Sequence, residues 1–341
     1  MHEAPRILVV RRDNIGDLVC TLPIFEGIRR HCPDAHVGAL VNSYNVPLLQ
    51  GNPYIDRVHV YTKSKHAPDA GRLAIARDRL RLIAELRTER YDVVLHAGSR
   101  PRAEMRGLTW LSGISRQILD RDQGRPVHEI DRVYALLHAL GVSGAAPAPR
   151  LELPRQKVAD VRDALAKRDY GGAIGLHISA REDENRWPLE NFESLIRIGA
   201  ERGLRFVLFW APGESTRPEH PGDDDRARAL LGRCRAEPVI GYPTENILEL
   251  AAGLAAVRRL VGSDGGHIHI AAAVGTPVVG LYCGHKVARW RPQGPSHRVL
   301  EGERVARIPV GDVIDALFQE PAILDTEIGE SDRHGFGLGT K

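Results

Sequence analysis

A short polar segment near the start of the sequence carries a carboxylate that could act as a general base. Residues 14–17 (Asn-Ile-Gly-Asp) follow the apolar run Ile7–Val10 and open a stretch with helical periodicity. From this turn, Asp17 could take a proton from an acceptor hydroxyl, and Asn14 and Gly16 could contact that acceptor. The alternative is that Asp17 only stabilises the helix start, where the helix dipole favours a negative charge. The sequence leaves both roles open.

A second, longer polar segment also follows an apolar run. It extends from His177 to Pro188, and a new helix is expected there because proline suits the first turn of a helix. Several of its side chains can donate hydrogen bonds to phosphate or sugar oxygens, namely Ser179, Arg181, Asn185 and Arg186. The alternative is an ordinary polar loop that Trp187 anchors by packing. The first interpretation predicts a site for a phosphorylated ligand.

A third segment places an acidic residue and two glycines before a predicted helix at residues 267–274. Free N–H groups at such a helix start attract an anion, and glycines let a diphosphate approach the backbone. We therefore expect Asp264 to bind ribose or sugar hydroxyls, and Gly265 and Gly266 to line a diphosphate site. The segment has neither the G-x-G-x-x-G spacing of a dinucleotide fingerprint nor the Gly-Lys-Ser/Thr of a P-loop.

Two histidines lie within this predicted helix. His267 and His269 are two residues apart and therefore point in different directions, whereas a helical metal site needs ligands four apart. We therefore predict no metal site. We expect His269 to donate a hydrogen bond to a phosphate; the alternative is that the backbone at the helix start satisfies it.

The elements that would position these segments alternate between strands and helices. Apolar runs predict strands at 6–10, 35–41, 57–61, 91–95, 172–178, 205–210, 257–262 and 277–282. Periodicity predicts helices at 17–30, 72–90, 157–168, 190–202 and 267–274. This order is typical of doubly wound parallel sheets, whose ligands bind beyond the carboxyl ends of the strands. Because the stretch 144–149 breaks the order, we predict two Rossmann-like α/β domains, residues 1–150 and 151–320, and a flexible tail at 321–341.

The periodicity also predicts which helix faces are buried. The first helix presents an apolar face of Leu18, Leu22, Phe25 and Ile28. The helix at 72–90 has a predicted inner face of Leu73, Ala76, Leu80, Ile83 and Leu86. Its solvated side is predicted to carry Arg77, Arg79 and Arg81.

Further basic residues of the first predicted domain mostly follow the ends of strands. They are Lys63, Lys65, Arg100, Arg102 and Arg106. Scattered basic residues usually form a solvated surface, but such a group can also bind a phosphorylated or carboxylated acceptor. Arg100 and Arg102 are the better candidates for the acceptor, because they follow the predicted strand at 91–95 directly.

Composition and charge exclude several classes of protein. The chain has 341 residues and a net charge of only +3, which argues against nucleic acid as the main partner. Its four cysteines form no C-x-x-C pair, so we expect reduced thiols and neither a zinc site nor a disulfide framework. No apolar run reaches the roughly 20 residues of a membrane helix, and the first residues lack the apolar stretch of a signal peptide. We therefore expect a cytoplasmic protein.

Taken in this order, the segments resemble the motifs of one enzyme family. Arg-x-x-Asn-Ile-Gly-Asp17 resembles its N-terminal motif, and Asn-Arg-Trp-Pro188 resembles its Lys-Arg-Trp-Pro motif. The third segment, with the helix that follows it, resembles the motif Asp-x-Gly-x-x-His-x-x-Ala-Ala, and residues 288–292 resemble what comes next. The family is the ADP-heptose:lipopolysaccharide heptosyltransferases, glycosyltransferase family 9, and the resemblance extends to about residue 320.

The resemblance implies a GT-B fold and sugar transfer with inversion, using an ADP-sugar as donor substrate and no metal or other cofactor. The first domain would hold the acceptor, and the second would hold the nucleotide sugar. Asp17 matches the proposed base of the family, while Asp264, Gly265, Gly266 and His269 match its donor-binding loop. The usual acceptor is a phosphorylated, Kdo-bearing lipid A core. This implies an anionic glycolipid partner and peripheral contact with the cytoplasmic face of the inner membrane.

Two departures from the family pattern concern the donor phosphates. The family often has a phosphate-binding Lys where this chain has Asn185, and Gly-Pro-Thr-Asp-Pro where this chain has Cys-Gly-His-Lys-Val287. Losing a fixed cation weakens diphosphate binding unless another takes its place. We hypothesise that Lys286, together with Arg181 or Arg186, supplies the missing charge.

Other functions compatible with these residues remain to be weighed. A nucleotide-sugar 2-epimerase of similar shape would need further carboxylates around the sugar, and the sequence identifies none. A non-catalytic nucleotide-sugar binder is compatible with Asn185 but would not need Asp17. A family member with another donor or acceptor stays open, whereas a nicotinamide dehydrogenase is disfavoured by the missing G-x-G-x-x-G.

Overall fold

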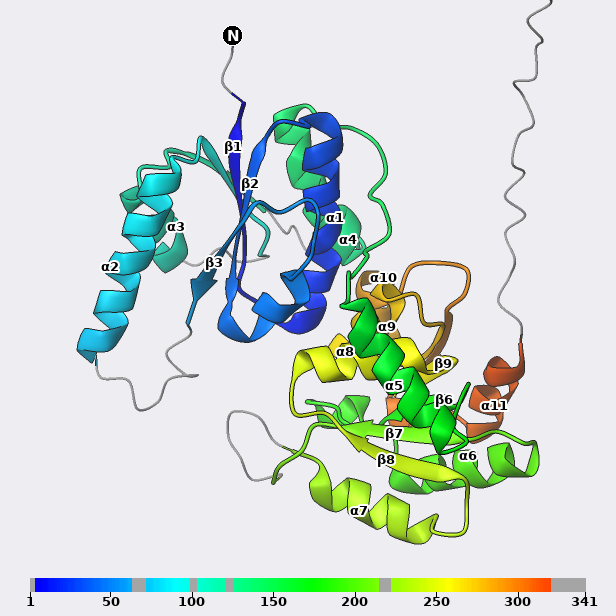
Figure 1. The fold of residues 1–341 in the computed structure, drawn as a ribbon. Coiled ribbons are helices and arrows are strands. Elements are labelled where there is room, and N and C mark those ends of the chain that lie inside the picture. Colours follow the sequence, from blue (N-terminus) through cyan, green and yellow to red (C-terminus); the bar gives the residue numbers. More distant parts are fainter. Residues whose placement is uncertain (1–3, 63–71, 99–102, 121–125, 215–221, 320–341) are drawn as a thin grey trace, which may run out of the picture.

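Two α/β domains lie one above the other in the computed structural model, which describes residues 4–62, 72–98, 103–120, 126–214 and 222–319 (Figure 1). Each domain is a parallel sheet covered by helices on both faces. The helices return the chain to the other end of the sheet, and because strands are added on both sides of a central strand, these right-handed connections lie on both faces. This confirms the predicted doubly wound fold class.

The first domain has the strand order β3-β2-β1-β4-β5. Its strands are β1 (Arg6–Arg11), β2 (His36–Asn42), β3 (Arg57–Tyr61), β4 (Val93–His96) and β5 (Arg116–Leu119). One face is covered by α1 (Ile15–His31) and α4 (Glu129–Tyr134), and the other by α2 (Arg72–Glu89) and α3 (Ala103–Leu111) (Figure 1). Two 3-10 helices, η1 (Ser43–Leu49) and η3 (Ala135–Leu140), complete it.

The second domain has the strand order β11-β10-β9-β6-β7-β8. Its strands are β6 (Ile174–His177), β7 (Phe206–Trp210), β8 (Val239–Pro243), β9 (Arg259–Ser263), β10 (Val278–Cys283) and β11 (Arg298–Gly302). Its helices are α5 (Arg155–Lys167), α6 (Leu189–Glu201), α7 (Asp224–Arg233), α8 (Ile247–Ala256), α9 (Gly266–Ala273), α10 (Gly284–Trp290) and α11 (Val310–Phe318). The 3-10 turns η4 (Asp183–Asn185) and η5 (Val305–Arg307) complete it.

One hydrophobic cluster continues from one domain into the other. Side chains alternate along a strand, so Ile7 and Val9 of β1 face α1, whereas Leu8 and Val10 face α2 and α3. The cluster that includes Ile7 and Val9 also includes Phe209 and residues of α8 and α9 in the second domain. The interface between the domains therefore includes an apolar contact, in which α1 lies against α9.

The buried face of α2 differs from the one predicted. Leu82 and Leu86 are buried at 3% and 0% exposure, whereas Leu73 and Leu80 are 87% and 68% exposed. The prediction was wrong for Leu73, Ala76 and Leu80, and right for Ile83 and Leu86. The helix has leucines on two faces, and only one face can meet the sheet. Periodicity alone does not show which of the two leucine faces is buried.

Arg79 of α2 is also not on the solvated side, contrary to the prediction. Its guanidinium lies 3.6 Å from the centroid of the Tyr61 ring and close to Glu104. A guanidinium is weakly hydrated and stacks on aromatic faces, so Arg79 ties α2 to β3 and α3. Arg77 and Arg81 are exposed, as predicted.

Residues 144–149, predicted as a linker, lie between η3 of the first domain and α5 of the second. Gly144 within it has a left-handed backbone, with φ at 109°, and Leu151 N–H donates to the Ala273 carbonyl of α9 at 3.0 Å. The boundary at residues 150 and 151 stays a prediction. The tail at 321–341 lies outside the described residues.

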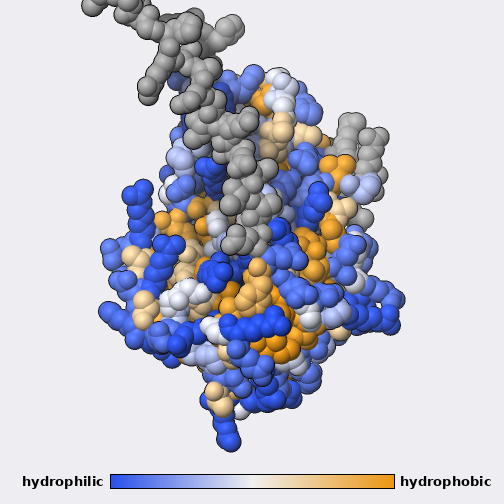
Figure 2. Space-filling model, turned by 90° about the vertical axis from the view of Figure 1, so that its right-hand side faces the viewer, coloured by the Kyte–Doolittle hydropathy of each residue, from blue (hydrophilic) through white to orange (hydrophobic). Residues whose placement is uncertain are grey.

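The surface on the side of α11 is mostly hydrophilic, with hydrophobic groups showing between polar side chains (Figure 2). Such a mixture is usual for a surface exposed to water. Within the described part of the chain, no helix combines the length and the apolar character needed to cross a membrane. All four cysteines are free, in agreement with the sequence.

Candidate functional site

The helix starts of the first and third polar segments meet at the domain interface. A Cβ atom added to Gly16 of α1 would lie 2.7 Å from the ring of His269, and one added to Gly266 of α9 would lie 2.9 Å from Ile15. Neither position has room for a side chain, so the two glycines let the helix starts touch. Gly16 therefore approaches the other domain closely, and its predicted contact with an acceptor stays a prediction.

Asp17 lies in the first turn of α1 and is partly exposed. One of its carboxylate oxygens accepts a hydrogen bond from Asn14 N–H at 2.9 Å, which satisfies a free donor of the helix start. The other oxygen lies 2.5 Å from Nη2 of Arg11. Asp17 thus stabilises the helix start, as the alternative interpretation predicted. Because part of it remains exposed, it can also act on a substrate.

The turn that carries Asp17 is braced by β2 and the residues after it. Asn42 Nδ2 and the Tyr44 hydroxyl each donate to the Asp13 carbonyl, at 2.9 Å. Arg181 from the second polar segment lies across the interface, with Nη1 at 3.4 Å from Asn14 Oδ1. This contact brings a predicted donor-binding residue beside a predicted acceptor-binding one.

Behind Asp17 lies a buried charge network that the sequence did not predict. Arg11, 2% exposed, ends β1 and contacts Asp17, Asp13 and Glu129. Glu129, 0% exposed, begins α4 and is also contacted by Arg132 and, from the second domain, by Arg289 of α10. Arg132 contacts Asp120 as well. Every charge at the centre of the network therefore has a partner of opposite sign.

Burial and pairing shift the pKa values within this network in opposite directions. Burial would lower the pKa of Arg11, but the carboxylates of Asp17, Glu129 and Asp13 outweigh it and raise the pKa. Burial raises the pKa of Glu129, although Arg11 and Arg289 oppose this. The pKa of Arg132 is lowered to about 10, by burial and then by the like charges of Arg11 and Arg289.

The second polar segment holds a cation that comes from another part of the chain. Lys286 of α10 lies 3.3 Å from Oδ1 of the buried Asn185 and is paired with Glu182 at 2.5 Å and Glu184 at 2.7 Å. The ammonium group therefore lies at the tip of the Asn185 side chain. Burial lowers the pKa of Lys286, but the hydrogen bonds to Glu182 and Glu184 outweigh it and raise the pKa.

Arg186 points to different partners. It lies 3.1 Å from Asp223 and 3.5 Å from Asp183, and among the described residues its side chain makes no hydrogen bond to Asn185. The Ser179 hydroxyl accepts from Ala211 N–H at 3.3 Å, and the Trp187 indole is buried and donates to the Ile308 carbonyl at 3.0 Å. Trp187 is therefore a packing anchor, as the alternative for this segment proposed.

Asp264 is a buried carboxyl whose pKa responds to charges from both domains. Its pKa is raised to about 6, first by burial and further by the charges of Glu182 and Asp17, while Lys286 and His285 oppose the shift. The influence of both Asp17 and Lys286 on one carboxyl means that the first and third segments face the same region. At pH 7.5 this carboxyl is largely ionised and can accept hydrogen bonds from hydroxyls.

His269 is buried in the domain interface. Its Nδ1 lies 3.5 Å from the Cys20 sulfur, its ring meets Trp290 edge-on, and burial lowers its pKa to about 4. Next to it, His177 and His267 are stacked with ring centroids 3.8 Å apart. Burial lowers the pKa of both, to about 4 for His177. The phosphate contact predicted for His269 stays a prediction.

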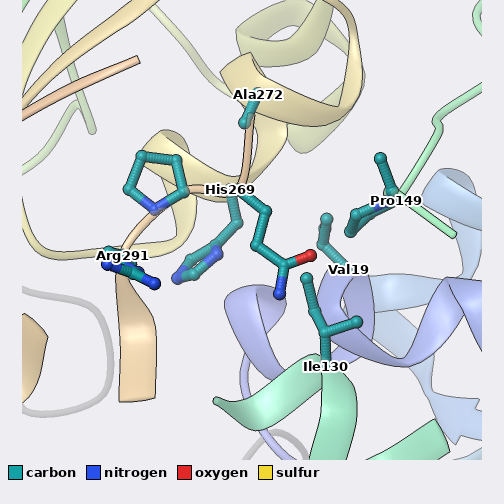
Figure 3. Close-up of a pocket in the computed structure, with 9 residues that line it drawn as sticks. Val19, Ile130, Pro149, His269, Ala272 and Arg291 are labelled. Carbon is teal, nitrogen blue, oxygen red and sulfur yellow. The ribbon is translucent and has the colours of Figure 1, made fainter. Parts of the chain in front are cut away.

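A cavity of about 30 Å³ lies beside His269 between the domains (Figure 3). It is lined by Val19, Ile130, Ala148, Pro149, His269, Ala272, Arg291, Pro292 and Gln293. It has room for about one water molecule, whereas ligand sites usually measure hundreds of Å³. This cavity is therefore a packing gap in the interface, and a nucleotide sugar would have to bind elsewhere.

Some predicted site residues cannot be placed. Arg100, Arg102, Lys63 and Lys65 lie outside the described residues, so their role toward an acceptor stays a prediction. Among the residues that the structure describes, no group of three or more His, Cys, Asp or Glu side chains is arranged to hold a metal. The predicted absence of a metal is not tested by this arrangement.

Comparisons of the sequence with known proteins agree with the motifs. The family model described as glycosyltransferase family 9 (heptosyltransferase) matches residues 102–309, which is more than half of the chain. Lipopolysaccharide heptosyltransferase 3 of Escherichia coli K12 is 25% identical over 296 residues, covering 81% of this chain and 82% of its own. Lipopolysaccharide core heptosyltransferase OpsX of Haemophilus influenzae is 22% identical over 311 residues, covering 85% and 82%.

Solved structures show the same arrangement of domains. The family 9 glycosyltransferase of Veillonella parvula superposes with a TM-score of 0.80 at 19% identity, covering 93% of this chain and 97% of its own. The E. coli heptosyltransferase WaaC with ADP superposes with a TM-score of 0.71 at 18% identity, covering 92% and 98%. These likenesses confirm the predicted two-domain GT-B fold.

Proposed function

The chain belongs to glycosyltransferase family 9, and on that premise we propose that it moves a heptose or related sugar from an ADP-sugar to a lipopolysaccharide core-type acceptor. One observation carries the proposal: the helix starts that carry Asp17 and Gly266 meet at the domain interface, where Gly16 lies against His269 and Gly266 lies against Ile15. A base from one domain is thereby brought next to an anion site from the other. The similarity to two lipopolysaccharide heptosyltransferases, and to a heptosyltransferase solved with ADP, supports the donor and the acceptor.

The donor half of the proposed site combines a helix start with a lysine. The N–H groups at the start of α9 attract the diphosphate, and Lys286 adds a charged hydrogen bond. Asp264 accepts hydrogen bonds from ribose or sugar hydroxyls. The diphosphate leaving group would then be neutralised by these groups without a metal ion, which is how the proposed reaction avoids a divalent cation.

The acceptor half supplies the base. Asp17 takes the proton of the attacking acceptor hydroxyl, and the oxygen forms a bond to the anomeric carbon. The bond from that carbon to the β-phosphate oxygen breaks, and ADP leaves with the electron pair. Because the acceptor attacks opposite the leaving group, the configuration of the anomeric carbon is inverted. Arg11 holds the carboxylate of Asp17 in place during this step.

The acceptor is a glycolipid in this proposal, and the outer face of α2 supports contact with its membrane. Leu73, Leu80 and the cations Arg77 and Arg81 are exposed on this helix, at the edge of the first domain away from the second (Figure 1). The neighbouring helix α3 adds Trp110, which is 65% exposed. The end of α3 lies next to α2, because Arg87 Nε of α2 donates to the Leu111 carbonyl at 3.0 Å. Exposed apolar and basic groups on one helix are typical of peripheral contact with anionic lipids.

Sugar transfer and nucleotide binding, measured on the purified protein, test the proposal. We expect transfer from ADP-heptose to a core acceptor that lacks heptose, with or without EDTA, and tighter calorimetric binding of ADP than of UDP or GDP. Asp17→Asn is the matched control, because it should keep ADP binding and lose transfer. Preference for UDP or GDP would overturn the proposed donor. Binding of ADP without transfer to any core acceptor would indicate a binder or a different acceptor.

A further inference from the structure

We infer that Glu129 is a positioning residue that makes the alignment of Asp17 depend on contact with the donor-binding domain. This inference rests on the proposed function, because it assigns the base to Asp17. It concerns a side chain that none of the sequence motifs includes.

Glu129 is completely buried and uses both carboxylate oxygens. Oε1 lies 2.7 Å from Arg11 Nη2 and 2.5 Å from Arg132 Nη2. Oε2 accepts from Arg132 Nε and from Arg289 Nε, each at 3.0 Å. Three guanidinium groups therefore converge on one carboxylate that water does not reach.

The contact with Arg11 is shared with Asp17. The same Nη2 atom of Arg11 lies 2.5 Å from Asp17 and 2.7 Å from Glu129. Arg11 is buried, and its other Nη donates to the Ala97 carbonyl. Because the guanidinium is planar and rigid, a shift of Glu129 moves Nη2 and thereby changes the direction in which Asp17 is held.

The contact with Arg289 crosses the domain interface. Residues 289–293 of the second domain make three hydrogen-bonded contacts with the start of α4 and the residue before it, and Arg289 makes the first of them. The other two contacts involve His128, which is hydrogen-bonded to the Arg291 carbonyl at 2.8 Å and to Gln293 at 3.2 Å. Within the first domain, Arg11 and Arg132 are shared among Glu129, Asp17, Asp13 and Asp120. Arg289 therefore adds a third positive charge to this acidic network, and it does so only when the second domain is in contact with α4.

The donor side of the site lies on the same helix as Arg289. Lys286 and Arg289 are one helical turn apart on α10, so the helix that carries the proposed phosphate cation also contacts Glu129. Contact between α10 and α4 would thus hold Asp17 in position for the acceptor only when the helix that carries Lys286 is in place, whereas Lys286 itself is held within the second domain by Glu182 and Glu184. This links the geometry of the base to the presence of the donor-binding domain.

Steady-state kinetics and ADP calorimetry on the full chain separate this role from donor binding. In Arg289→Met we expect kcat to fall about tenfold and in Glu129→Gln about 100-fold, since small misplacements of reacting groups are costly. We expect the Kd of ADP and the KM of the nucleotide sugar to stay within about twofold, because neither residue would contact the donor. Arg289→Lys, which can restore the ion pair, should recover most of kcat. The double variant Glu129→Gln with Arg289→Met should have the same kcat as Glu129→Gln alone, because both changes act through the same contact.

Glu26→Gln is the matched control, because Glu26 is another buried glutamate paired with an arginine, on α1. Arg289→Met keeps the inference testable if Glu129→Gln does not fold, since Arg11 and Arg132 still pair with Glu129. Unchanged kcat in Arg289→Met, a loss of ADP affinity in it, or an equal loss of kcat in Glu26→Gln would overturn the inference. Absence of transfer by the wild-type protein would overturn the proposed function itself and this inference with it.

Discussion

The two halves of the proposed site hold their charges in different ways. On the acceptor side, Arg11 and Glu129 are buried, and Arg11 is paired with three carboxylates. On the donor side, Lys286 is paired with Glu182, which is exposed, and with Glu184, which is partly exposed. One half is a fixed network, and the other is a cation held by groups that face water.

The difference suits the two tasks. A base needs a constant direction, and removing one partner of a buried ion pair costs about 3–5 kcal/mol, which keeps such a network intact. A donor site must exchange its ligand at every turnover, and exposed ion pairs contribute little to stability. A diphosphate can therefore displace Glu182 and Glu184 from Lys286, whereas nothing in the reaction needs to displace Glu129 from Arg11.

The largest effect is expected from removing the charge of Asp17. Asp17→Asn keeps the size of the side chain but cannot accept the proton, so kcat should fall by about 10²–10⁴. The Kd of ADP should stay the same, because the donor half does not include this residue. Initial rates and calorimetry measure the two quantities. A variant that retains kcat would show that another group is the base.

Acid should destabilise the fold partly through the stacked pair of His177 and His267 in the donor-binding domain. Burial lowers the pKa of His177 from 6.5 to about 4, and that of His267 also lies well below 6.5. Between these values the unfolded chain binds more protons than the folded one. The stability contributed by each neutral histidine is thus complete above about pH 6.5 and is lost as the pH falls toward 4.

At pH 5 this loss amounts to about 2 kcal/mol for one histidine whose pKa falls from 6.5 to 4. Urea unfolding at pH 7.5 and pH 5 measures it. His267→Leu removes one titrating ring, so its midpoint should fall less between the two pH values than that of the wild type. His138→Leu changes an exposed histidine and should behave like the wild type. Equal losses in all three proteins would contradict the prediction.

These buried groups also mark what the sequence could and could not reveal. The strands were predicted because a parallel sheet buried on both faces needs continuous apolar runs, such as Ile7–Val10. Asp17 and Asp264 were found because each begins a helix after such a run. Both signals are local, within about ten residues.

The network behind Asp17 carries no local signal. Glu129 is 118 residues from Arg11 and 160 residues from Arg289 in the chain, and α4, which holds it, was not among the predicted helices. An arginine at the end of a strand looks like any surface residue until the fold buries it. Arg11 stands in the motif Arg-x-x-Asn-Ile-Gly-Asp17, which was the one available hint.

The structure favours Lys286 over Arg186 as the cation that takes the place of the family's lysine at position 185. Lys286 lies at the tip of Asn185, whereas Arg186 is paired with Asp223 and Asp183. We expect Lys286→Met to weaken ADP binding about 10- to 100-fold, the effect of losing one charged hydrogen bond. Arg186→Met, the matched control, should change it less than about threefold. Calorimetry with ADP measures both, and a larger effect of Arg186→Met would reverse the assignment.

The smallest effect concerns the two glutamates that hold Lys286. Glu182→Gln combined with Glu184→Gln removes competitors of the diphosphate, so ADP should bind about two- to fivefold more tightly. The same double change should not strengthen ADP binding when Lys286→Met is also present, because the glutamates then have no cation to release. Glu190→Gln, which frees the exposed Arg233 instead, serves as the control. Weaker ADP binding in the double variant would mean that these carboxylates contact the nucleotide themselves, and the donor half would then be as fixed as the network around Glu129.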